Sequence, residues 1–452
     1  MAQAFFLLVT LWAFGKAWKN FMKIRRNILL GRDEKIEGDT AQRLRNTFLI
    51  AFGQKKMFAN WIPAVLHLFI YVAFLFTQVE LIEILVDGFF GVHRFFAHYL
   101  GFFYNIIISF IEVLSVLAFV ATIAFLVRRN VMKISRFQKP ELDGFPRFDA
   151  NLILFFEIVL IAAIFSMNGA DAVLQSVYPE KYHPEVGKFL VSGWFGPTFL
   201  GNWDVHFLVF LERFGWWLHY AMVLIFLNYL PFSKHLHVIL AFPNTFYARL
   251  NSRGEAKNMP EIMTEVRNML GLPNDTPPPV SEGEMAFFGA KDVTSLSWKN
   301  VMDAYSCTEC GRCTAACPAN QTGKKLSPRK IMMDVRDRAD EIGRKLDGGD
   351  TRLIGADHKG QAVLNAANFD DGRDLFSHIS REEIRACTTC NACVEACPIL
   401  INPLDIILQL RRYEILTLSE GPTDWVPMFT SLENGGSPWQ MSDERAKWTA
   451  QM

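Results

Sequence analysis

The sequence predicts a mainly α-helical protein in two parts, a five-helix membrane bundle followed by a smaller helical domain that is rich in cysteine. Two observations support this prediction. Five apolar segments lie before residue 245, and each approaches the ~20 residues that cross a bilayer as a helix. All eight cysteines lie after residue 300, in a polar region with helical spacing over 328–346. The zero net charge and 51% hydrophobic content suit a chain that is embedded in a membrane over part of its length.

The apolar segments set the expected domain boundaries. We expect a transmembrane domain over 1–245, a linker over 246–295, a cysteine domain over 296–415 and a C-terminal tail over 416–452. The linker is inferred from composition, because 274–284 is rich in proline and polar residues. The membrane spans are expected at about 4–18, 61–86, 103–127, 151–167 and 206–230.

Lysine and arginine counts predict the orientation of the spans. Residues 16–60 carry eleven and 128–149 carry six, whereas 87–102 carry one and 169–205 carry two. The positive-inside rule then places the N-terminus outside and the cysteine domain in the cytoplasm, as in a multi-pass protein of the cell inner membrane. No basic region precedes the first span and no small-residue cleavage site follows it, so we expect an uncleaved anchor. The charge balance gives no support for binding nucleic acid.

Every cysteine belongs to one of two copies of the pattern C-x2-C-x2-C-x3-C-P. This is the ferredoxin spacing for two [4Fe–4S] clusters, in which the fourth cysteine of each run ligates the other cluster. It assigns one cluster to Cys307, Cys310, Cys313 and Cys397, and the other to Cys387, Cys390, Cys393 and Cys317. A lone Cys-x2-Cys would also suit zinc, but two complete runs with matched prolines and no spare cysteine favour clusters. Free thiolates also agree with a reducing cytoplasm.

Histidines in the apolar segments predict a second kind of cofactor, because an ionisable side chain inside a membrane span is costly to keep. His67 lies early in the second span and His237 closes the fifth, so we expect a haem b between them. His219 lies 18 residues before His237, roughly 27 Å along a helix, and is a candidate ligand of a second, outer haem. No histidine on the second span matches its depth, and His98 in an external segment is the other candidate. Any one of these histidines can instead be a polar residue satisfied between helices.

The membrane half resembles the cytochrome b (gamma) subunit of respiratory nitrate reductase, through its five spans and the segment Leu-Pro-Phe-Ser-Lys-His-Leu-His at 230–237. This resemblance implies that His67, His219 and His237 are haem ligands. The family's fourth ligand would fall near Thr77, where this sequence departs from it. The cysteine half is similar to the helical ferredoxin subunit of heterodisulfide reductases. Together they resemble the membrane subunits of heterodisulfide reductase-related complexes, including electron-transfer-flavoprotein:menaquinone oxidoreductases.

These resemblances imply a transmembrane cytochrome b-like bundle followed by an α-helical dicluster ferredoxin domain. The implied partners are membrane lipid, a quinone and a cytoplasmic redox subunit, either a CCG-domain protein or an electron-transfer flavoprotein. Larger relatives carry a cysteine-rich CCG domain for the terminal chemistry. No spare cysteine here could build one, so we expect the terminal catalytic site on another subunit.

Quinol oxidation releases protons, so carboxylates are expected near a quinone site. Glu80 and Glu83 lie about one turn apart in the outer part of the second span, and Arg213 opens the fifth. These three residues are the candidates for a quinone or proton site. Internal ion pairing that fastens the bundle would explain them equally well.

Three functions fit the sequence. We favour a membrane-bound subunit that relays electrons between the (mena)quinone pool and a cytoplasmic redox partner through haem b and two [4Fe–4S] clusters. A redox sensor or assembly scaffold without quinone turnover would not need five spans with buried histidines. A self-contained heterodisulfide-type reductase would need a reactive group, but the clusters use every cysteine and no phosphate-binding loop is present.

Overall fold

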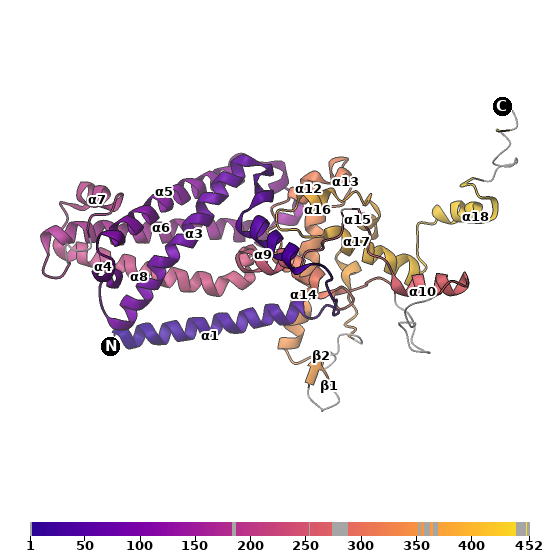
Figure 1. Cartoon of the computed structure of the whole chain (residues 1–452), viewed down its shortest axis with the longest axis horizontal. Coiled ribbons are helices and arrows are strands. Elements are labelled where there is room, and N and C mark those ends of the chain that lie inside the picture. The colour runs from indigo at the N-terminus through magenta and orange to yellow at the C-terminus, as the bar shows by residue number, and fades with distance from the viewer. Residues whose placement is uncertain are drawn as a thin grey trace.

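The structure, a computed structural model, describes residues 2–182, 187–252, 254–273, 288–350, 354–356, 362–364, 369–439 and 449. It is mainly helical, as predicted, and a bundle of long helices adjoins a compact group of shorter ones (Figure 1). The long helices are α1 (Ala2–Ile28), α3 (Trp61–Phe90), α5 (Phe102–Asn130), α6 (Phe145–Val177) and α8 (Val205–Tyr229). The core of the expected linker, 274–284, and the end of the expected tail lie outside the described residues.

Four of the described helices are long and apolar enough to cross a membrane: α3, α5, α6, and α8 with its short extension to Phe232. Local signals set their ends. Gly91 ends α3 in the left-handed conformation that glycine adopts without strain. The side chain of Asp204 caps α8 by accepting hydrogen bonds from the backbone N–H groups of His206 and Phe207. Arg128 and Arg129 lie in the last turn of α5, where positive charge suits the helix dipole.

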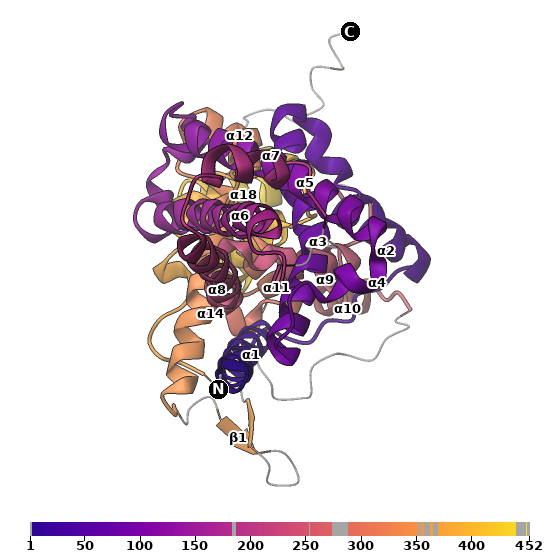
Figure 2. The same cartoon turned by 90° about the vertical axis from the view of Figure 1, so that its left-hand side faces the viewer.

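The sequence led us to expect five membrane spans. α1 corresponds to the first of them, and it differs from the other four in its composition. It is 27 residues long, but its apolar stretch gives way to lysines from Lys16 onward, so it is not among the four. Phe6 and Ala13 are buried against the bundle, whereas Leu8 and Trp12 on the opposite face are more than 60% exposed. Viewed end-on, α1 lies at the edge of the bundle (Figure 2).

α1 also joins the bundle to the cysteine half (Figure 1). Near its C-terminal end, Arg26 and Lys23 bind Asp347 at 2.6 and 2.7 Å. The Asn27 amide donates a hydrogen bond to the hydroxyl of Tyr305 at 3.0 Å. The two halves therefore share a polar interface at this end of α1.

The remaining elements are shorter. Around the bundle lie α2 (Thr40–Asn46), a π-helix (Thr47–Phe52), α4 (Phe95–Leu100), α7 (Ser192–Phe195) and α9 (His237–Phe246), whereas α10 (Pro260–Met269) lies on the far side of the cysteine half (Figure 1). The cysteine half contains α11 (Trp298–Ser306), α12 (Arg312–Ala316), α13 (Pro318–Gln321), α14 (Pro328–Asp347), α15 (Arg381–Arg385), α16 (Ala392–Ala396) and α17 (Pro403–Arg412), followed by α18 (Trp425–Gly435). Between the two cysteine runs, β1 (Ile354–Ala356) pairs antiparallel with β2 (Ala362–Leu364).

The segment between the two cysteine runs is anchored by Arg338 of α14. Its side chain is fully buried and binds Asp292 at 2.7 Å and Asp371 at 2.8 Å. A buried guanidinium is tolerated only when its charge and donors are satisfied, and these two carboxylates satisfy them. Arg338 thus links α14, the long helix between the two cysteine runs, to one segment before it and one segment after it in the chain.

Helices α6 and α8 form the most extensive pair in the bundle, and Gly215 lets them approach. A Cβ atom at Gly215 of α8 would lie only 2.7 Å from the carbonyl oxygen of Ala163 in α6. Small residues allow this kind of close backbone contact between membrane helices.

We therefore expect Gly215→Ala to destabilise the protein by about 1–3 kcal/mol, since the helices must move apart to admit the methyl group. Thermal unfolding of the detergent-solubilised chain measures the change. Gly15→Ala is the matched control, because a Cβ at this exposed site in α1 meets no atom within 4 Å. Equal melting temperatures for the two variants would contradict the close-packing argument.

Candidate functional site

The first cysteine run folds into a loop followed by the short helix α12. Gly311 has φ 71°, a left-handed conformation that glycine adopts without strain, and Glu309 adopts the same region at φ 55°. This turn directs the backbone N–H of Glu309 at the sulfur of Cys307, with a nitrogen–sulfur distance of 3.4 Å. The loop therefore turns a backbone N–H group toward a sulfur that the sequence assigns to a cluster.

The second run repeats this conformation before α16. Thr389 has φ 55° and Asn391 has φ 61°, and the N–H of Thr389 donates to the sulfur of Cys387 at 3.4 Å. Asparagine is among the residues that best tolerate the left-handed region. The two runs thus form an internal repeat in structure as well as in sequence.

The structure brings together each set of four cysteines that the sequence predicts. α12 packs against α16, so the C-terminal parts of the two runs lie side by side. One cavity is lined by Cys317 together with the first three cysteines of the second run, Cys387, Cys390 and Cys393. Cys397 lies within electrostatic range of the first run, Cys307, Cys310 and Cys313.

The cysteines lie in surroundings that disfavour free thiolates. Burial, reinforced by neighbouring cysteines, raises the pKa of Cys307, Cys393 and Cys397 to about 12. Iron binds the thiolate form, so binding of a cluster must displace these protons. The donor sets fit iron–sulfur clusters, which hold such thiolates in their deprotonated form.

The two cysteine loops differ in exposure. Cys307 and Glu309 are buried against the bundle, whereas Thr388, Thr389 and Cys390 of the second loop are exposed. The first run therefore faces the membrane half and the second faces solvent.

His67 of α3 and His237, the first residue of α9, face each other with ring centroids 6.5 Å apart. With a metal–nitrogen distance of about 2.0 Å on each side, two imidazole centroids lie about 6.3 Å apart across one iron. Nδ1 of His67 lies 3.1 Å from the side-chain oxygen of Gln54, and Nδ1 of His237 lies 3.1 Å from the carbonyl oxygen of Lys234. A proton on Nδ1 then leaves Nε2 free for a metal, the usual arrangement of ligating histidines.

Burial lowers the pKa of His237, which keeps this imidazole neutral and able to bind iron. His67 and His237 therefore fit a haem in distance, tautomer and, for His237, charge.

The structure does not bring His98 to His219. His219 is buried in α8, and its Nδ1 lies 3.2 Å from the carbonyl oxygen of Leu160 in α6. His98 is exposed on α4 with its ring against Tyr99. Thr77 donates its hydroxyl to the carbonyl of Phe74 in its own helix at 3.2 Å.

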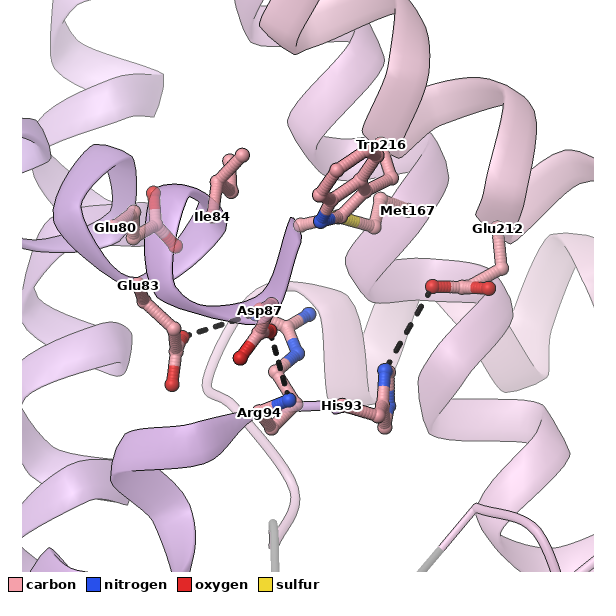
Figure 3. Close-up of a pocket in the computed structure, with 9 residues that line it drawn as sticks. All are labelled: Glu80, Glu83, Ile84, Asp87, His93, Arg94, Met167, Glu212 and Trp216. Carbon is pink, nitrogen blue, oxygen red and sulfur yellow. Dashed lines mark hydrogen bonds and ion pairs between the residues drawn. The ribbon is translucent and has the colours of Figure 1, made fainter. Parts of the chain in front are cut away.

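Glu80 and Glu83 lie at a cavity in the outer part of the bundle (Figure 3). The remaining lining comprises the apolar Ile84, Met167 and Trp216 and the ionisable Asp87, His93, Arg94 and Glu212. Arg213 is outside this lining, but its Nε lies 3.0 Å from Glu212, which belongs to it.

Arg94 contacts two of the four acids that line this cavity. Its buried side chain lies 3.8 Å from Glu83, and its backbone N–H donates to Asp87 at 2.9 Å. Glu83 also accepts a hydrogen bond from the hydroxyl of Tyr104 at 2.6 Å. Glu80 is different, because its side chain is 2% exposed and neither of its oxygens has a hydrogen-bond partner.

Comparison with known proteins supports the iron–sulfur clusters. The 4Fe-4S dicluster domain family matches residues 306–401. The probable iron–sulfur-binding oxidoreductase FadF of Bacillus subtilis is 27% identical over 93% of this chain and 57% of its own length. The EtfAB:quinone oxidoreductase of Syntrophomonas wolfei is 27% identical over 92% of this chain and 54% of its own length. The chain is a relative of iron–sulfur oxidoreductases.

Two further comparisons define the extent of this relationship. A probable membrane-anchored ferredoxin of Chromohalobacter salexigens is 34% identical over 30% of the chain and 20% of its own length. The chain spans about half the length of the first two relatives. No solved structure matches it.

The dicluster domain contacts the end of the bundle that carries the histidine pair. Arg312, between Cys310 and Cys313, donates to the carbonyl of Met57 at 3.4 Å, shortly before α3 begins. Asn244 of α9 donates to the carbonyl of Ile399 at 2.9 Å. These contacts with the dicluster domain therefore lie next to His67 and His237.

Sequence reasoning missed several residues of these sites. The sequence patterns assign no role to His93 or Arg94, yet His93 binds Asp171 at 3.0 Å and Arg94 binds Asn168. Asp171 and Asn168 lie in α6 as polar residues within an apolar helix, a signal that could have identified them.

The crossed grouping predicts which cysteine variants share a phenotype. Cys397→Ser and Cys313→Ser should both remove the cluster of the first run and lower the iron content from about eight to about four atoms per chain. Cys317→Ser should remove the other cluster, together with Cys393→Ser. Electron paramagnetic resonance of the reduced protein distinguishes the two signals. Loss of the same signal in Cys397→Ser and Cys393→Ser would rule out the crossed grouping.

Proposed function

We propose that the chain is a membrane-bound electron-transfer subunit that relays electrons between a (mena)quinone pool and a cytoplasmic redox partner. The observation that carries this proposal is the position of the His67–His237 pair, directly beside the first cysteine run. When bound, a haem b and two [4Fe–4S] clusters supply one-electron centres at these sites. The relatives named as iron–sulfur and quinone oxidoreductases support this class of function.

The proposed haem b ligands are His67 and His237. Gln54 and the carbonyl of Lys234 orient the two rings, so that both Nε2 atoms are available to one iron. His219 has an oriented ring but no facing histidine among its described contacts, so the proposal includes one haem.

The difference in exposure supports an order for the two cysteine sets. Cys307, Cys310, Cys313 and Cys397 form the set next to the bundle, and Cys387, Cys390, Cys393 and Cys317 form the set that faces solvent. A soluble partner can approach only the exposed set closely. We place its docking site at Thr388, Thr389 and Cys390.

The quinone site is proposed at the outer cavity of Figure 3. A quinol has hydroxyl groups to donate, and the unpaired carboxyl of Glu80 is a buried acceptor that points into this cavity. Trp216, Met167 and Ile84 supply an apolar wall for a ring. Glu83 would then be the next group to accept the proton, and the charge of Arg94, 3.8 Å away, would stabilise its carboxylate.

Topology and partner complete the proposal. We place the N-terminus outside and the dicluster domain in the cytoplasm of a multi-pass inner-membrane protein, because Lys and Arg are concentrated in 16–60 and 128–149. We also propose α1 as a fifth, peripheral span, since its exposed apolar face suits lipid. A CCG-domain protein or an electron-transfer flavoprotein would carry the terminal site, and the name EtfAB:quinone oxidoreductase supports the flavoprotein.

The haem assignment predicts a selective loss of cofactor. His67→Ala should abolish the b-type signal in an oxidised-minus-reduced optical spectrum and leave the iron–sulfur signals in place, because the two sites use separate ligands. His206→Ala is the control, since this exposed histidine at the outer start of α8 should retain the full spectrum. Absence of a b-type signal in the unaltered protein would remove the quinone relay.

The quinone assignment predicts that Glu80→Gln and Glu83→Gln lower quinol-linked turnover by about 10²-fold or more, the usual effect of removing a proton acceptor. Haem content should stay normal. Glu157→Gln is the control, because this acid of α6 does not line the cavity. Unchanged turnover in Glu80→Gln at normal haem content would leave these acids with a packing role only.

A further inference from the structure

A buried ion pair connects the bundle to the first cysteine loop. Lys234, just beyond α8, is 8% exposed, and its Nζ lies 2.6 Å from Oε2 of Glu309, which is 5% exposed. Lys234 also donates to the carbonyl of Pro146 at 2.6 Å. The other oxygen of Glu309 accepts from Arg336 at 2.8 Å. Both members are therefore fixed by contacts within their own half of the protein.

Each member of this pair also touches a residue that we assign to a redox centre. The carbonyl oxygen of Lys234 lies 3.1 Å from Nδ1 of His237. The backbone N–H of Glu309 donates to the sulfur of Cys307 at 3.4 Å. One ion pair thus bridges the whole junction, from a histidine of the bundle to a cysteine of the dicluster domain.

The second cysteine run shows that the loop does not need a carboxylate at this position. Thr389 occupies the place of Glu309, with the same φ of 55° and the same N–H to sulfur hydrogen bond. Thr389 is uncharged and exposed. The carboxylate of Glu309 is therefore not required to form a cysteine loop, and its contacts with Lys234 and Arg336 are what distinguish it.

A buried charge acts strongly on a nearby redox centre, because little water screens it. A negative charge disfavours the addition of an electron and lowers a reduction potential, whereas a positive charge raises it. Charge and hydrogen bonding around the ligands are the means by which a protein tunes such centres. Here Lys234 and Glu309 place one charge of each sign next to ligands of two centres, with Asp149 3.8 Å from Lys234 and Arg336 2.8 Å from Glu309.

We propose that Lys234 and Glu309 are positioning residues that jointly set the reduction potentials of the centres held by His237 and Cys307. This inference rests on the proposed function. The pair holds the ligands of both centres in place, and its opposite charges offset each other. A change of Lys234 alone should therefore shift the reduction potentials of both centres in one direction. A change of Glu309 alone should shift both potentials in the opposite direction.

The test uses the solubilised full chain and three variants, Glu309→Thr, Lys234→Met and the double variant. Redox titrations are followed by optical spectra for the haem and by electron paramagnetic resonance for the clusters. Glu309→Thr removes a negative charge and should raise both potentials. Lys234→Met removes a positive charge and should lower both. The double variant restores the net charge, so both potentials should return close to their original values.

The second cluster supplies the internal control. Its potential should stay unchanged in all three variants, and Thr389→Glu should lower that potential alone. If Lys234→Met does not fold, because it removes one of the two cationic partners of the buried Glu309, the difference between Glu309→Thr and the double variant gives the effect of Lys234. The proposal would be overturned if the two single variants shifted the reduction potentials in the same direction. It would also be overturned if the potentials of the double variant lay further from the original values than those of either single variant.

The proposed relay and the proposed role of the Lys234–Glu309 pair are tested by different outcomes. A missing haem spectrum in every protein would overturn the proposed relay but would leave the cluster beside Cys307 measurable. Opposite shifts of that cluster would then still support the role of Glu309 and Lys234. A normal haem with potentials that none of the variants change would overturn the role of the pair and leave the relay intact.

Discussion

The contact between the inner end of the bundle and the first cysteine loop is the constraint on which the arrangement of the sites depends. Lys234, Arg312 and Asn244 each reach across this junction, and all three are at or near the segments that carry His67, His237 and the cysteines. Because α1 fixes the same two halves through Arg26 and Asn27, the junction is held from two directions. Two sets of ligands that are far apart in sequence are therefore kept at a constant separation.

The outer end of the bundle obeys a different constraint, the cost of burying charge in an apolar layer. Arg94 and Tyr104 supply partners for Glu83, and His93 supplies one for Asp171. Ion pairing within the bundle was the alternative to a quinone or proton site in the sequence analysis. It explains why Glu83 and Asp171 are buried. It does not explain Glu80, whose oxygens have no partner. Glu80 therefore differs from the paired acids around it in that its oxygens accept no hydrogen bond.

Local patterns made much of this protein predictable. Cysteine spacing determines a loop of a few residues, so the two runs and their crossed grouping follow from the sequence, and the depth of His67 and His237 follows from counting along helices. The roles of Lys234, His93 and Arg94 do not, because their partners lie on other helices. The position of α1 at the edge of the bundle is set by packing and could not be predicted either. Its lysine-rich half is helical but too polar to count as a membrane span.

The unequal burial of the cysteine loops has a consequence for the lifetime of the protein in air. An opening that admits a redox partner also admits dissolved oxygen and peroxide, and exposed sulfur ligands are oxidised first. The loop at Cys390 is open to solvent, whereas Cys307 is covered by the bundle. Oxidative damage should therefore begin at the outermost centre and disconnect the chain from its soluble partner while the inner centres are still intact.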